Sequence, residues 1–177
     1  MLHEKADPNA LDVRVDTRGA ALPWWQPWLA LALFTFLVNF IWEMVQVPFY
    51  LGHASGSYFR MVEGCAQATL GDVGIALAAY AVVALARGRR WLASPRAGSI
   101  VAFIALGMAV TAIIERVSVD VFARWSYAAF MPTIAGVGVV PLLQWLTLPP
   151  LVLWLARRHL AGPLTSRQDG SARAGEA

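Results

Sequence analysis

The sequence offers little from which a redox or thiolate metal site could be built. Cys65 is the only cysteine, which excludes an internal disulfide and a CxxC motif. The three histidines, His3, His53 and His159, lie far apart along the chain, so a haem or zinc site that needs several histidines is disfavoured. The catalytic signatures GxSxG, HExxH and GxGxxG and the P-loop are also absent from the sequence, which removes the most common hydrolase and nucleotide-binding classes.

Charge is scarce as well. Only 14% of the residues are charged, 58% are hydrophobic, and the mean hydropathy is +0.56. This composition is typical of a membrane protein. The net charge is +3, but the basic residues flank apolar runs instead of forming a stripe with aromatic residues. They therefore predict a membrane topology and no nucleic-acid partner.

The sequence does contain four long apolar runs. They cover about residues 28–50, 64–86, 98–120 and 137–156. About 20 apolar residues in a helix cross the hydrocarbon core of a bilayer, so each run predicts a transmembrane helix. We expect an all-α fold, a compact bundle of four transmembrane helices at residues 24–160, with disordered tails at 1–23 and 161–177.

Prolines interrupt the last part of this pattern. Pro149 and Pro150 lie in the second half of the fourth run, where they are expected to kink the helix or divide it in two. Pro132 and Gly136 precede that run and predict an irregular loop between the third and fourth helices.

The distribution of lysine and arginine predicts the orientation. Eleven of these residues lie in the two tails and the second connector, whereas three lie in the first and third connectors. Cytoplasmic segments of membrane proteins are enriched in lysine and arginine. The sequence therefore predicts a multi-pass protein of a bacterial-type inner membrane, with both termini in the cytoplasm.

One polar face runs along the first predicted helix. Thr35, Asn39, Glu43, Gln46 and Tyr50 recur at spacings of four, four, three and four, which keeps them on one side of a helix at roughly 100° per residue. A carboxylate at membrane depth costs several kcal/mol. Glu43 is therefore expected to face the interior of the bundle.

The other helices carry polar residues at a similar depth. We estimate the depth of each residue from its position along its predicted helix, at about 1.5 Å per residue, and from the predicted orientation. By this count, the outer part of the membrane contains Asp72, Glu115 and Gln144. We therefore expect one polar pocket towards the extracytoplasmic face, and its walls are Asn39, Glu43, Gln46, Asp72, Glu115 and Gln144.

The residue types suggest roles within this pocket. Three buried carboxyl groups must hold protons, pair with cations or bind a metal. The candidate catalytic acids and bases, or ligand contacts, are therefore Glu43, Asp72 and Glu115. The candidate ligand-binding residues are Asn39, Gln46, Gln144, His53 and Arg116. The sequence does not identify a cofactor or metal, although carboxylate oxygens would suit Mg²⁺, Ca²⁺ or Mn²⁺.

Several functions are compatible with such a pocket. The preferred expectation is an integral membrane protein that binds a lipidic or small polar ligand and, if it is an enzyme, also processes that ligand. The alternatives are a proton or cation relay or small transporter that works as an oligomer, and a non-catalytic accessory or assembly subunit of a larger membrane complex. The expected partners are the lipid bilayer, such a ligand, and a second copy of the chain or another membrane protein. The polar residues could also serve only to hold the helices together.

Overall fold

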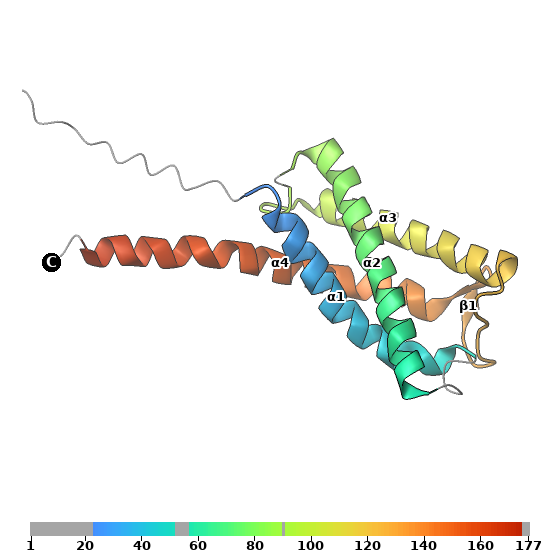
Figure 1. Cartoon of the computed structure of the whole chain (residues 1–177). Coiled ribbons are helices and arrows are strands. Elements are labelled where there is room, and N and C mark those ends of the chain that lie inside the picture. The colour runs from blue at the N-terminus through green and yellow to red at the C-terminus, as the bar shows by residue number, and fades with distance from the viewer. Residues whose placement is uncertain (1–22, 52–56, 90, 175–177) are drawn as a thin grey trace, which may run out of the picture.

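A computed structural model of the chain describes residues 23–51, 57–89 and 91–174. Within them, four helices are long and apolar enough to cross a membrane (Figure 1). The helices are α1 (Gln26–Gln46), which continues into the 3₁₀ turn η1 (Val47–Phe49); α2 (Tyr58–Arg87); α3 (Ala97–Arg116), which continues into the π-helical turn η2 (Val117–Val121); and α4 (Val139–Ala174). The prediction of a mostly helical chain with four helices of membrane-spanning length is confirmed.

The membrane-length segments are Gln26–Phe49, Tyr58–Arg87, Ala97–Val121 and Val139–Ala161. The second segment begins earlier than the predicted residue 64, because Ser57 caps it by accepting a hydrogen bond from the backbone N–H of Arg60 at 3.4 Å. Such a cap satisfies one of the free N–H groups of the first turn. The other starts agree within two residues.

Beyond Ala161, α4 continues as a helix to Ala174 and projects away from the bundle (Figure 1). The helix α4 therefore extends beyond residue 160, where the sequence predicts the end of the bundle. Of the N-terminal tail, only Pro23 lies among the described residues. The disorder of both tails stays a prediction.

The four helices form a ring in which α1 and α3 each contact α2 and α4. An apolar core fills the end of the ring next to the α2–α3 connector. Leu31, Tyr80 and Phe103 are almost completely buried there, and Leu92 of the connector packs with them. The ring of Trp28 lies edge-on to Tyr80, with 4.8 Å between centroids.

The outward face of α1 is apolar and its inward face is polar. Its most exposed side chains repeat at every fourth position: Leu29, Leu33, Leu37, Ile41 and Val45. Thr35, Asn39, Glu43 and Gln46 on the opposite face are buried. This is the reverse of a helix on the surface of a soluble protein. It is the arrangement that a lipid environment favours.

Of the two outcomes predicted for Pro149 and Pro150, a kink or a division of the fourth helix, the division does not occur, because α4 is continuous through both. Each proline removes one backbone hydrogen bond, so the carbonyl groups of Trp145 and Leu146 lose their usual helical partners. The helix is closely packed at this point. The Trp145 side chain is 4% exposed and lies directly against Gly107 of α3.

The third connector contains a small hairpin that the sequence did not predict. Strands β1 (Thr133–Ile134) and β2 (Val137–Gly138) pair antiparallel. The two turn residues, Ala135 and Gly136, have φ values of 52° and 78°. Two successive positive φ values are the mark of a type I′ turn, which joins strands tightly. The connector is therefore ordered by a turn, where the sequence predicted an irregular loop.

The contact between α3 and α4 predicts the effect of one substitution. A Cβ atom at Gly107 would overlap the Trp145 ring, whereas a Cβ atom at Gly74 would meet nothing within 4 Å. Gly107→Ala should therefore lower the free energy of unfolding by about 1–3 kcal/mol through overpacking. The matched control Gly74→Ala should leave stability unchanged or slightly raised, because alanine favours the helix.

Denaturant unfolding of both variants in the same detergent is the measurement. Equal stability of the two variants would contradict the packing of Trp145 on Gly107.

Candidate functional site

Glu43 lies at the centre of a hydrogen-bonded group on α1. It is 9% exposed, and its Oε1 atom accepts a hydrogen bond of 2.7 Å from Nε2 of Gln46. Gln46 in turn accepts a hydrogen bond of 3.0 Å from the indole nitrogen of Trp42. The spacings of three and four residues place these side chains next to one another on the helix surface. Glu43 therefore has a fixed orientation towards the bundle interior.

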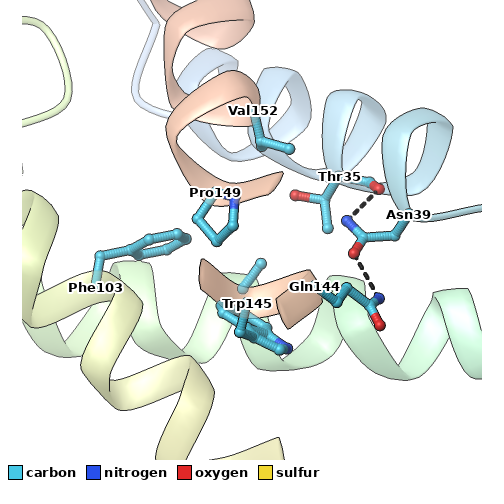
Figure 2. Close-up of a pocket in the computed structure, with 8 residues that line it drawn as sticks. Thr35, Asn39, Phe103, Gln144, Trp145, Pro149 and Val152 are labelled. Carbon is cyan, nitrogen blue, oxygen red and sulfur yellow. Dashed lines mark hydrogen bonds between the residues drawn. The ribbon is translucent and has the colours of Figure 1, made fainter. Parts of the chain in front are cut away.

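Gln144 of α4 connects this group to the neighbouring helices. Its Nε2 atom donates to Oδ1 of Asn39 at 2.7 Å and to Oδ2 of Asp72 at 2.7 Å. Oε1 of Glu43 is a more distant acceptor at 3.4 Å. Asn39 is held in turn by a hydrogen bond of 2.8 Å from its Nδ2 to the carbonyl of Thr35 (Figure 2). One side chain thus joins α1, α2 and α4.

The carboxyl groups of Glu43 and Asp72 lie close together, because both are neighbours of Nε2 of Gln144, at 3.4 Å and 2.7 Å. Two carboxyl groups can share a hydrogen bond only when one of them holds a proton. Among the described residues, the recorded ion pair joins Arg116 and Asp120, and no cation is paired with Glu43 or Asp72. A proton held by one of the two acids would compensate the charge of this pair.

Glu115 of α3 forms a second group with aromatic donors. Its Oε2 atom accepts hydrogen bonds from the hydroxyl of Tyr127 at 2.6 Å and from the indole nitrogen of Trp125 at 3.3 Å. The hydroxyl of Tyr50 lies 3.5 Å from Oε1. The backbone N–H of Gly138 donates to the Tyr127 hydroxyl at 3.0 Å. Tyr127 therefore links the hairpin to the carboxyl group.

Both tyrosines keep their protons over a wide pH range. Burial, followed by the hydrogen bond to Glu115, raises the pKa of Tyr127. Burial, followed by the charge of Glu115, raises the pKa of Tyr50. Protonated phenols can donate to a carboxyl group at every physiological pH.

The structure brings most of the predicted pocket residues together. Glu43 and Asp72 both lie next to Nε2 of Gln144. Glu115 lies towards the same end of the bundle, where η1 meets the third connector. The exit of α1 is fixed there, since Tyr50 pairs with Tyr127 in an antiparallel bridge. Asn39, Gln46 and Gln144 contact this cluster through the bonds given above. We call these six residues, with Tyr127, the carboxyl cluster.

His53 and Arg116 are the other two predicted ligand contacts. His53 lies outside the described residues. Arg116 is half-exposed and forms an ion pair of 2.8 Å with Asp120. It also donates a 3.0 Å hydrogen bond to the carbonyl of Ala135, and a Cβ atom at Gly136 would overlap its guanidinium group. Arg116 therefore holds the hairpin turn in place instead of facing the carboxyl groups.

The space beside the cluster is small. A cavity of about 10 Å³ lies between Thr35, Asn39, Gln144, Trp145 and Pro149 (Figure 2). Within the described residues, the Thr35 hydroxyl and the Trp145 indole N–H have no hydrogen-bond partner, and the hydroxyl is turned towards Pro149. A water molecule needs about 10–15 Å³ and polar partners. This cavity suits one water molecule, and a larger ligand would require the helices or the hairpin to move.

Sequence reasoning missed three contributors to the cluster. The pocket residues predicted from the sequence do not include Trp42, Trp125 or Tyr127. All three donate hydrogen bonds to the cluster. Trp42 could have been found from its spacing of four residues to Gln46. The other two lie in a connector without periodicity, so no sequence pattern places them on Glu115.

No group of three or more histidine, cysteine, aspartate or glutamate residues is arranged to hold a metal ion within the described part of the chain. Comparison with protein-family models, curated proteins and solved structures finds no match to this chain. The chemistry of the site must therefore be argued from its own residues.

The geometry around Glu115 predicts the effect of removing one hydroxyl. Tyr127→Phe deletes the 2.6 Å bond to Glu115 and the acceptor of the Gly138 N–H. It should lower the free energy of unfolding by about 1–3 kcal/mol, because a buried acceptor loses a strong partner. The control Tyr58→Phe, at a residue that is 73% exposed, should have no measurable effect.

Thermal unfolding in one detergent, followed by circular dichroism, compares the two variants. A Tyr127→Phe variant as stable as Tyr58→Phe would show that Tyr127 does not fix the hairpin to α3.

Proposed function

We propose that this chain is an integral protein of a bacterial-type inner membrane, with both termini cytoplasmic, that carries an acid–base site facing the outside. The site binds and exchanges protons. It would act on a small polar or lipidic ligand that presents a proton-accepting group at that face. The excess of lysine and arginine in the tails and in the α2–α3 connector supports this orientation.

The observation that supports this proposal is the proximity of the carboxyl groups of Glu43 and Asp72, which lie 3.4 Å and 2.7 Å from the same Nε2 atom of Gln144. A packing role would be met by amides alone, which can hydrogen-bond between helices without holding a proton. A shared proton beside a third carboxyl group, Glu115, supplies both a donor and an acceptor. General acid–base chemistry requires such a proton donor and such a proton acceptor.

The surroundings of the cluster support access from one side only. Towards the hairpin, Trp125 and Tyr127 are partly exposed, and Tyr127 contacts Glu115 directly. Towards the α2–α3 connector, the path is filled by the almost completely buried side chains of Leu31, Tyr80 and Phe103. Protons cannot pass such an apolar layer without polar groups or water. A one-sided site therefore fits better than a relay through this single chain.

The proposal also limits the ligand. A cavity of about 10 Å³ cannot hold a lipid headgroup or a metabolite. Binding would therefore require displacement of the hairpin, the element that covers Glu115 through Tyr127. Arg116 holds the turn of that hairpin by its hydrogen bond to Ala135, so it would influence opening without touching the ligand.

Infrared spectroscopy tests the shared proton. At neutral pH the protein should show the carbonyl stretch of a protonated carboxylic acid, and this band should disappear or shift in Glu43→Gln and in Asp72→Asn. Both amides keep hydrogen-bonding capacity, so the variants should still fold, as circular dichroism would verify.

Glu63→Gln is the matched control, because Glu63 is an exposed carboxylate at the start of α2. It should leave the band unchanged. A wild-type spectrum without a protonated acid, or a band that survives both cluster substitutions, would reject the proposal.

The exposure of Asp72 favours a second candidate, an assembly role. Glu43 and Glu115 are buried, whereas Asp72 is only half-buried in the isolated chain. A partly exposed acid at membrane depth is unfavourable unless protein covers it. A second copy of the chain, or another membrane protein, would provide that cover. Native mass spectrometry of the gently extracted protein distinguishes the candidates, since a strictly monomeric species would remove the assembly role.

A further inference from the structure

The opposite end of the bundle has a cavity of a different character. It lies between the end of α2 and the start of α3, and its volume is about 460 Å³. Volumes of this size are typical of sites for small ligands. Arg87, Arg89 and Arg96 line it, and no carboxylate of the described residues forms an ion pair with any of them. The cavity therefore concentrates uncompensated positive charge.

The start of α3 adds hydrogen-bond donors to this charge. No side chain caps the helix, and the N–H groups of Ser99 and Ile100 bond back to the carbonyl of Arg96. The preceding N–H groups, those of Ala97 and Gly98, have no partner within the helix. The Arg87 guanidinium lies close by, 3.9 Å from the position of a Cβ atom on Gly98. A helix N-terminus beside a guanidinium favours an anion.

Two nearly buried side chains complete the wall. Trp91 is 5% exposed and Ser99 is 3% exposed. The described residues provide no hydrogen-bond partner for the Trp91 indole N–H, but protein atoms cover this nitrogen. The arginines and the start of α3 are therefore the features that favour an anion.

The wall is also rigid. The Tyr80 hydroxyl donates to the carbonyl of Arg89 at 3.1 Å. The Trp91 ring packs against Tyr80 and Phe103, with centroids 5.4 Å and 6.0 Å apart. These contacts hold the connector in place before any ligand binds, which reduces the entropy cost of binding.

We propose that the cavity between α2 and α3 is a binding site for a phosphate group, supplied either by a phospholipid headgroup or by a free phosphate compound. A guanidinium group can donate two parallel hydrogen bonds to two oxygens of a phosphate group. The free N–H groups at the start of α3 can donate to a further oxygen. The site lies where two membrane-length helices end, at the depth of lipid headgroups. It does not depend on the carboxyl cluster.

The test uses the full chain with two probes. One probe is phosphatidylglycerol, added to delipidated protein and followed by native mass spectrometry. The other is inorganic phosphate, followed by titration calorimetry in detergent. Arg87→Gln/Arg96→Gln removes two arginines from the cavity. Arg157→Gln/Arg158→Gln removes the same charge from the end of α4 and is the control for diffuse attraction.

The cavity variant should weaken binding of at least one probe by at least about tenfold, since each charge-assisted hydrogen bond contributes strongly. The control variant should bind as the wild type does. Loss of the lipid alone identifies a headgroup site, and loss of inorganic phosphate alone identifies a site for free phosphate.

Equal weakening in both variants would overturn the proposal, because it would show only diffuse attraction of basic residues to anions. Failure of the wild type to bind either probe would overturn it as well. If the glutamine variant does not fold, Arg87→Lys/Arg96→Lys replaces it. The lysine variant keeps the charge but loses the paired donors, so unchanged affinity in it would likewise reject the site.

Discussion

Gln144 donates hydrogen bonds from one side-chain nitrogen to Asn39 on α1 and to Asp72 on α2. In a lipid environment, burial of apolar surface gives helices little reason to associate, and such polar contacts between helices become important. The same contacts place Asp72 beside Glu43, whose orientation Gln46 fixes. Helix packing and the acid pair therefore depend on one carboxamide. Loss of this carboxamide would remove the 2.7 Å donor of Asp72, whereas Glu43 would keep its hydrogen bond from Gln46.

The chain has two chemically opposite ends. Carboxyl groups gather where η1 meets the hairpin, and arginines gather where α2 turns into α3. Between them lies a layer of aromatic and aliphatic side chains. We propose proton exchange for the acidic end and phosphate binding for the basic end. Because the two ends are separate, a substitution at one end should leave the other unaffected.

Much of the fold could be predicted from the sequence, because a membrane-spanning helix is specified by the length of an apolar run. The polar face of α1 followed from spacing alone, since the period of a helix determines which side chains share a side. Continuity of α4 through Pro149 and Pro150 could not be predicted. At this point the Trp145 ring lies against Gly107 of another helix, and the sequence pattern of one helix does not reveal such a contact.

The candidate site was less predictable than the fold. The hairpin depends on positive φ values at Ala135 and Gly136, and alanine gives no signal for such a turn. The role of Tyr127 depends on that hairpin. Arg116 follows Glu115 in sequence, but successive helical residues point about 100° apart, and it holds the turn instead of the carboxyl group. Contacts made by connectors therefore required the structure.

A sided titration of the protonated carboxylic acid tests the central claim most directly. The protein would be inserted in one orientation into vesicles, and the infrared band would be followed while pH is raised on one side at a time. We predict that the band responds to pH on the side of the hairpin and not on the side of the α2–α3 connector. A response from the connector side, or the absence of a titrating acid, would contradict a one-sided acid–base site.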